Sequence, residues 1–207
     1  MQHDFILLDR SGSMASRWEE AVNSVNAYVK ELADKNVDTG VTLAVFDTNA
    51  LGRLDFVILR DRIIPATWRK VAPHEVYPRN GTPLNDATAE LLNLAERGHY
   101  DKVAIIIMTD GEENSSREYR VEAIRARLDT CRAKNWQVIF LGANFDNWQQ
   151  ATSYGNRMHS TVAMPSGTMR ATASAVAEKR AFYGVTGQAI NFSEEEKAEL
   201  AKQQNTN

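Results

Sequence analysis

Two acids and three hydroxyl side chains occupy positions from which they could bind one metal ion together. Asp9, Ser11 and Ser13 are spaced two residues apart at the end of an apolar run. Asp110 follows a second apolar run, and Thr82 precedes a predicted helix. All five groups offer hard oxygen atoms, without thiolate or imidazole. This chemistry excludes a dedicated zinc or copper site and favours Mg²⁺ or Mn²⁺.

The two acids are expected to need a cation between them. If the strands that end at Asp9 and Asp110 are neighbours in a parallel sheet, both carboxylates lie at the same edge. Two carboxylates at such a short distance repel each other, and the pKa of one of them rises unless a cation lies between them. Mg²⁺ prefers an octahedral shell of oxygen ligands and keeps several waters. We therefore expect direct bonds from the three hydroxyls, water-mediated contacts from the acids, and an open position for an anionic ligand.

Each of these residues also has an ordinary structural interpretation. Ser11 and Ser13 could be turn residues. Thr82 could be the N-cap of a helix whose first residue is Pro83. The dipeptide Asp110-Gly111 is common in turns. Their joint occurrence, in this order and at element ends, favours the metal site.

The elements that must position these groups alternate along the chain. We expect strands at residues 5–8, 41–46, 54–59, 102–109, 136–141 and 160–164, and helices at 18–34, 83–95, 117–134, 148–154, 167–183 and after Ser193. This alternation predicts an α/β fold, a doubly wound and mostly parallel sheet with helices on both faces. The link before residue 54 is too short for a crossover helix, so strand 54–59 should be an antiparallel edge strand.

Capping boxes are predicted at two helix starts, from Ser16 to Glu19 and from Ser193 to Glu196. The single cysteine, Cys131, lies in a helix-like stretch and is expected to be a small buried apolar group.

Composition limits the partners and the location. The chain has 207 residues, with 24 basic and 27 acidic side chains and a net charge of -3. Nothing in this balance favours nucleic acid or an anionic membrane, which select basic patches. No apolar run approaches the ~18 residues of a membrane span, and the first residues do not resemble a signal peptide. We expect a cytoplasmic protein.

Three motifs carry a resemblance to a known family. They are Asp9-Arg10-Ser11-Gly12-Ser13-Met14, Asn80-Gly81-Thr82-Pro83-Leu84-Asn85-Asp86-Ala87 and Thr109-Asp110-Gly111. Together they resemble the metal-ion-dependent adhesion site (MIDAS) of von Willebrand factor type A domains, of the compact intracellular type found in bacteria and phages. The resemblance implies a six-stranded sheet with the strand order 3-2-1-4-5-6. We expect residues 1–165 to form this domain and residues 166–207 a C-terminal helical extension that packs on it.

The resemblance also implies a function, that of a non-enzymatic module whose metal binds a glutamate or aspartate of a partner protein. Some bacterial relatives are adaptors for ring-forming ATPases, so such a partner is one expectation.

The alternative is a metal-dependent hydrolase or phosphotransferase that uses Asp9 and Asp110. The sequence offers little support for this alternative, because Ser11 stands where phosphatases of the haloacid-dehalogenase type have a second acid. The histidines are outside the motifs and are expected at the surface or in loops; they are His3, His74, His99 and His159.

Overall fold

The computed structural model describes residues 1–142, 152–155 and 160–203. Its six-stranded sheet has the order β3-β2-β1-β4-β5-β6. The strands are β1 (Gln2–Asp9), β2 (Gly40–Thr48), β3 (Leu54–Ile63), β4 (Lys102–Thr109), β5 (Gln137–Gly142) and β6 (Thr161–Ala163). Neighbouring strands are parallel, except for the antiparallel pair β2 and β3. The predicted fold class, strand order and antiparallel edge strand are confirmed.

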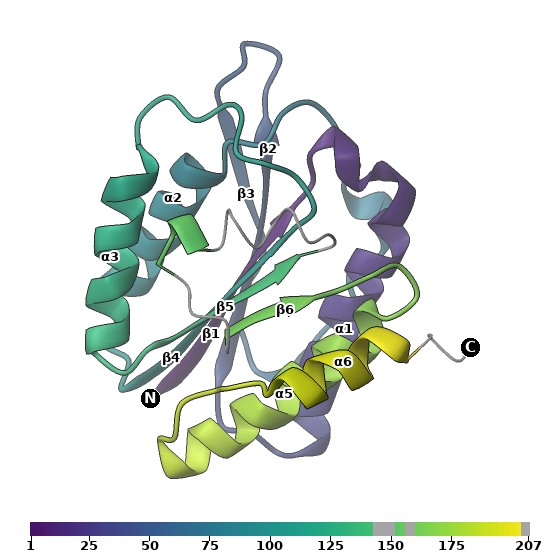
Figure 1. The fold of residues 1–207 in the computed structure, drawn as a ribbon, viewed down its shortest axis with the longest axis vertical. Coiled ribbons are helices and arrows are strands. Elements are labelled where there is room, and N and C mark those ends of the chain that lie inside the picture. The colour runs from purple at the N-terminus through teal and green to yellow at the C-terminus, as the bar shows by residue number, and fades with distance from the viewer. Residues whose placement is uncertain (143–151, 156–159, 204–207) are drawn as a thin grey trace.

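Helices cover both faces of the sheet (Figure 1). Those described are α1 (Trp18–Asp34), α2 (Leu84–Arg97), α3 (Val121–Ala133), α5 (Met169–Thr186) and α6 (Glu194–Lys202). The helices α2 and α3 lie on one face, and α1, α5 and α6 lie on the other. None of the described helices has the length and apolar content that a membrane span requires.

Each strand of the sheet centre contributes to two hydrophobic cores. In β1, Ile6 and Leu8 belong to the core with α1 and α5, whereas Phe5 and Leu7 belong to the core with α2 and α3. A strand buried on both faces needs a continuous apolar run rather than an alternating one. This requirement explains the run that precedes Asp9.

The sheet order places the ends of β1 and β4 side by side. These strands pair in parallel, with Leu8 opposite Met108. The next residues, Asp9 and Thr109, therefore leave the sheet at the same edge. Because β1 also pairs with β2 on its other side, this edge is the switch point at which open α/β sheets bind ligands.

The capping of α1 and α2 differs from the predicted or alternative capping. Residues Gly12–Arg17 form a 3-10 helix, and α1 begins at Trp18 without a side-chain cap, so the capping box from Ser16 is wrong. The helix α2 begins at Leu84 with Pro83 as its N-cap residue, so Thr82 is not the cap. The capping box at Ser193, by contrast, is confirmed. The helix predicted for residues 148–154 lies mostly outside the described residues.

The histidine predictions are wrong in one case. His3 is fully buried in β1, its Nε2 lies 2.9 Å from Thr42 Oγ1, and burial lowers its pKa to about 4. His74 and His99 are exposed as expected, and His159 lies outside the described residues. Cys131 is buried as predicted.

A buried ion pair joins α5 to the first strand. Arg180 is 0% exposed, and its Nε donates to Asp4 Oδ1 at 2.6 Å. The other guanidinium nitrogens donate to Gln2 Oε1 and Thr39 Oγ1, at 3.0 and 3.3 Å. Tyr28 donates to the second Asp4 oxygen at 2.8 Å. Burial raises the pKa of Asp4, and the charge of Arg180 opposes this rise. The two charges therefore depend on each other.

Replacing Arg180 by methionine should destabilise the fold by about 3–5 kcal/mol, because the charge of Asp4 would then be buried without its partner. Without Arg180 the pKa of Asp4 rises further, so the loss should be larger at about pH 8 than at about pH 5. Urea unfolding at both pH values measures it. Lys179→Met is the control, since Lys179 is part of a partly exposed ion pair with Glu196; it should cost less than about 1 kcal/mol. An Arg180→Met loss that is small and independent of pH would contradict the interpretation.

Candidate metal centre

Asp9 is the innermost acid of the predicted site. It is 0% exposed, and each carboxylate oxygen accepts a hydrogen bond. The backbone N–H of Ser11 donates to Oδ1 at 2.7 Å, and the hydroxyl of Thr109 donates to Oδ2 at 2.6 Å. Burial raises the pKa of Asp9 to about 6, and these hydrogen bonds oppose the rise. The carboxylate is thus fixed in place at the end of β1 while its charge remains costly.

The hydroxyls of the first loop connect this acid to Asp110. Ser11 Oγ lies 3.0 Å from Ser13 Oγ, and Ser13 Oγ donates to Asp110 Oδ1 at 2.7 Å. The turn is tight because Met14 N donates to the carbonyl of Ser11 at 3.1 Å, which starts the 3-10 helix. This helix replaces the predicted capping box, and it brings Ser13 back over the sheet edge.

Gly111 shows that three segments meet at one point. A Cβ atom at this position would lie 2.9 Å from Thr82 Oγ1, 3.2 Å from Ser13 Oγ and 3.4 Å from Asp9 Oδ2. Any side chain here would crowd the oxygens, so glycine keeps the space open. With the contacts of Ser11 and Asp110 given above, the structure brings all five predicted ligand residues together.

The Thr82 segment is held by the loop after β4. Thr82 N donates to Asn114 Oδ1 at 2.9 Å, and Asn114 N donates to the Thr82 carbonyl at 3.2 Å. Since α2 starts only at Leu84, the hydroxyl of Thr82 does not cap that helix. Its position beside Gly111 makes it a candidate ligand instead.

An ion-pair cluster that the sequence did not predict supports the loop with Ser11 and Ser13 and the loop with Thr82. Asp47, at 0% exposure, accepts from Arg10 Nη2 at 2.9 Å and from Arg79 Nε at 2.6 Å. Asp55 contacts the same two arginines at the rim. Arg79 N also donates to the Arg10 carbonyl at 2.9 Å. A signal was present in the sequence, since Asp47 directly follows the mostly apolar residues 41–46.

Two further acids anchor the loop after β4 rather than face the centre. Glu113 accepts the backbone N–H groups of Asn85, Ser115 and Ser116. Asp86 accepts those of Arg117, Glu118 and Tyr119. These bonds hold residues 115–119 in a non-helical form, which explains why α3 begins at Val121 and not at the predicted 117.

The donor set determines what the site can do. In the described part of the chain, no group of three or more His, Cys, Asp or Glu side chains is placed to hold a metal. The candidate centre instead combines two acids with neutral hydroxyls, which suits a hard cation with oxygen ligands. A phosphatase nucleophile would have to face its substrate, whereas both oxygens of the buried Asp9 are engaged by the protein.

Similar solved structures share this fold at low sequence identity. A mutant of the PilB minor pilin from Streptococcus sanguinis has a TM-score of 0.64 and 11% identity, over 90% of this chain and 63% of that one. A von Willebrand factor type A protein from Catenulispora acidiphila has a TM-score of 0.56 and 17% identity, over 86% and 42% of the two chains. The chain thus spans less than two thirds of these proteins.

A manganese-loaded Plasmodium vivax TRAP protein has a TM-score of 0.59 and 15% identity, over 84% of this chain and 71% of that one. Among curated proteins, no match was found. Residues 5–178 match the sequence model of the von Willebrand factor type A domain, so the match continues into α5. The chain therefore belongs to the von Willebrand factor type A domain family.

Proposed function

We propose that the protein is a non-enzymatic, metal-dependent protein-binding module. Mg²⁺ or Mn²⁺ would be held by Ser11, Ser13 and Thr82 directly, and by Asp9 and Asp110 through water, as in a complete MIDAS. When bound, the ion supplies an electrophilic position for a glutamate or aspartate of a partner protein. The protein's own residues fix the loops and keep Asp9 buried.

The observation that carries this proposal is the meeting of the oxygens beside Gly111. Thr82, Ser13 and Asp9 come from three segments of the chain, yet one absent Cβ would contact an oxygen of each. Burial raises the pKa of Asp9, and the charge of Asp110 adds to this rise to a smaller extent, so a bound cation would stabilise the charged carboxylate. The manganese-loaded state of one similar structure supports the choice of metal.

The proposal extends to the partners and the location. It requires an acidic partner residue, and it does not depend on whether the partner is a ring-forming ATPase. The net charge of -3 supports neither nucleic acid nor an anionic membrane as the ligand. We also propose that the protein acts in the cytoplasm of a bacterial or phage-infected cell, where a buried free thiol such as Cys131 stays reduced.

Saturating Mg²⁺ or Mn²⁺ should raise the melting temperature, because the ion binds only the folded state. At a concentration of about 100 times Kd the gain is about 2.7 kcal/mol, which for a chain of this size is roughly 5–10 °C. In Asp9→Asn the shift should disappear, as measured by calorimetry with and without metal. An unchanged shift in this variant would place the metal elsewhere.

The metal-induced shift should also depend on pH. With the pKa of Asp9 raised to about 6, the metal-free fold binds a proton that the unfolded chain releases. Its stability therefore falls as the pH rises through this range, and metal binding removes the cost. Scans with and without Mg²⁺ should show a larger shift at about pH 7.5 than at about pH 5. The opposite order would contradict the role of Asp9.

Asp47→Asn should weaken metal binding about tenfold although Asp47 is not a proposed ligand, because outer groups orient the inner ones. The buried acid fixes Arg10 and Arg79, which belong to the two loops that present the hydroxyls. Titration calorimetry measures the affinity. Asp55→Asn is the matched control: it pairs with the same arginines but is 29% exposed, so its effect should be smaller. Equal affinities in both variants and the wild type would refute this positioning role.

Partner binding should require the metal and Thr82. Affinity capture from the cells that make the protein, followed by mass spectrometry, should recover a partner with Mg²⁺ and lose it with chelator. Thr82→Ala should lose the same partner while keeping the fold, since Asn114 binds the backbone of this residue and not its hydroxyl. A partner recovered equally well in chelator would show that another face of the protein binds it.

A further inference from the structure

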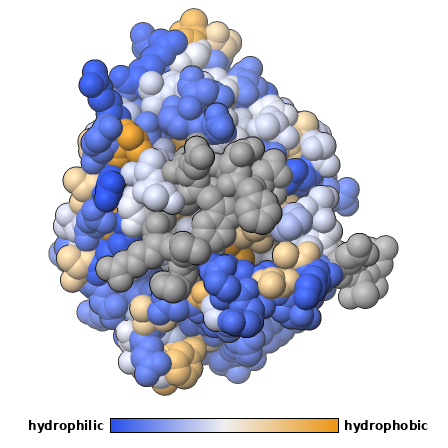
Figure 2. All heavy atoms as spheres, in the orientation of Figure 1, coloured by the Kyte–Doolittle hydropathy of each residue, from blue (hydrophilic) through white to orange (hydrophobic). Residues whose placement is uncertain are grey.

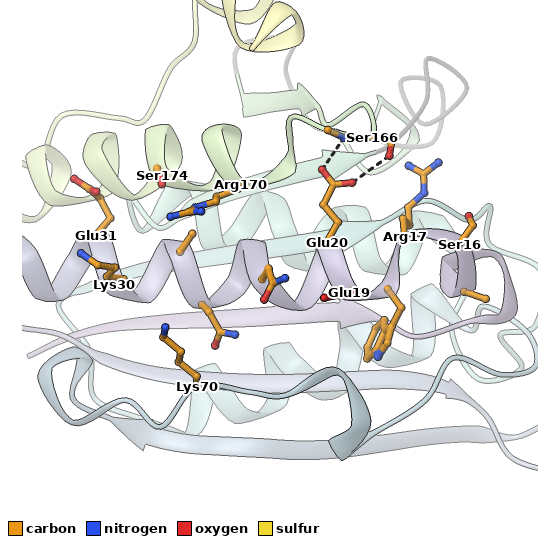
Figure 3. A pocket seen from close by; sticks show the side chains of 16 residues that line it. Ser16, Arg17, Glu19, Glu20, Lys30, Glu31, Lys70, Ser166, Arg170 and Ser174 are labelled. Carbon is orange, nitrogen blue, oxygen red and sulfur yellow. Dashed lines mark hydrogen bonds between the residues drawn. The ribbon is translucent and has the colours of Figure 1, made fainter. Parts of the chain in front are cut away.

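A groove with a volume of about 890 Å³ runs along α1 (Figure 3). Lys70 extends toward α1 from one side of it, and Arg170 extends from α5 on the other. The groove begins beside the candidate metal centre, because Arg17 lines it and the Nε of Arg17 lies 3.3 Å from Asp110 Oδ2. We call this feature the α1 groove.

The first wall of the α1 groove is fixed by Asn26. Its Oδ1 accepts from Val71 N at 2.9 Å and from Trp68 Nε1 at 3.0 Å. Its Nδ2 donates to the Val71 carbonyl at 2.8 Å. These bonds hold the segment that carries Lys70 against the helix, so the wall exists before any ligand binds.

The second wall is fixed by Glu20. Its carboxylate accepts from Gly167 N at 2.7 Å, from Met169 N at 3.1 Å and from Ser166 Oγ at 3.2 Å. An acid at this point also suits the positive end of the α5 dipole. The start of α5, and with it Arg170, is thereby fixed beside α1.

The charges in the α1 groove are unevenly engaged. Its basic residues are Arg17, Lys30, Lys70 and Arg170, and its acidic ones are Glu19, Glu20 and Glu31. Two of the acids already have partners, Glu20 in the start of α5 and Glu31 with Lys35 at 3.4 Å. Two of the basic residues are also paired, Arg17 with Asp110 and Lys30 with Asp34. Lys70 and Arg170 are exposed, and neither forms an ion pair with another described residue. In a protein of net negative charge, this groove therefore offers cations to a ligand.

The length of the α1 groove determines how many residues of an extended peptide it can hold. From Arg17 to the level of Asn26 and Lys30, the helix rises by roughly 14–20 Å. An extended peptide covers about 3.3 Å per residue, so this distance corresponds to roughly four to six residues.

We propose that the α1 groove binds an extended acidic segment of the partner, four to six residues from the carboxylate that the metal centre binds. The inference rests on the proposed function, since it takes the metal centre as one end of the binding surface. Preformed walls reduce the ordering cost of binding. Lys70 and Arg170 select the second acidic group through charge complementarity. Hydrophilic side chains cover most of the face of the protein that Figure 2 shows, outside the grey residues.

A synthetic peptide series tests the proposal. Each labelled peptide has a Gly/Ser background and carries one glutamate for the metal centre. A Glu-Glu pair follows this glutamate at a distance of about two to ten residues. In the reference peptides, Gln-Gln replaces the Glu-Glu pair. Fluorescence anisotropy with Mg²⁺ at low salt gives Kd. We expect the tightest binding at a spacing of about four to six residues, at least about tenfold tighter than the Gln-Gln reference. A flat dependence on spacing would overturn the proposal.

Variants locate the second contact. Lys70→Glu with Arg170→Glu should abolish the Glu-Glu advantage while leaving metal-dependent binding of the Gln-Gln peptides unchanged. The matched control is Arg69→Glu with Lys202→Glu, because both residues are exposed cations outside the groove; it should retain the advantage. If the control pair loses it equally, general charge and not the groove explains the binding.

The remaining outcomes separate the two proposals. Loss of all peptide binding in chelator supports the metal centre, whereas a Glu-Glu advantage that persists in chelator would refute the proposed function alone. An oligonucleotide of similar length that binds as tightly as the best peptide would overturn the acidic-segment proposal in favour of a general polyanion site. A dimer in sedimentation that Lys70→Glu dissociates would show that a second copy fills the groove.

Discussion

The structure depends on two carboxylates at the ends of neighbouring parallel strands. Asp9 ends β1, and Asp110 follows β4. The parallel pairing of these strands places the two acids at the same end of the sheet. Burial makes the charge of Asp9 costly, as its raised pKa shows. In the proposed function, a bound cation would relieve this cost, and the neutral hydroxyls of Ser11, Ser13 and Thr82 would keep the ion electrophilic. Both oxygens of Asp9 accept hydrogen bonds from the protein, from the backbone N–H of Ser11 and the hydroxyl of Thr109.

Other acidic and amide side chains near the ends of β1 and β4 are not candidate ligands. They hold the surrounding segments in place. Asp86 and Glu113 bind backbone N–H groups of the loop after β4, and Asp47 binds two arginines. Along α1, Glu20 and Asn26 hold the segments on either side. Functional loops are usually positioned by a fixed scaffold. In this protein, single side chains hold the loops in place through hydrogen bonds and ion pairs. In the candidate site and in the α1 groove alike, single side chains therefore fix the segments that form the walls.

The sequence predicted what depends on local pattern. The apolar runs identified the strands, the short link identified the antiparallel edge, and the three motifs identified the residues that meet beside Gly111. What it missed depends on distant contacts. Thr82 looks like a cap because of Pro83, but the loop after β4 determines its position. His3 looks like a terminal surface residue, yet the β1–β2 and β1–β4 pairings bury it. The role of Arg180 required a partner 176 residues away.

The most direct test of the central claim is anomalous diffraction from crystals grown with Mn²⁺. The account predicts one strong peak among the hydroxyls of Ser11, Ser13 and Thr82, with Asp9 and Asp110 in reach through water. It also predicts a position on this ion for a carboxylate from outside the chain. A structure that shows these five side chains without a metal at saturating Mn²⁺, or a peak bound elsewhere, would contradict it.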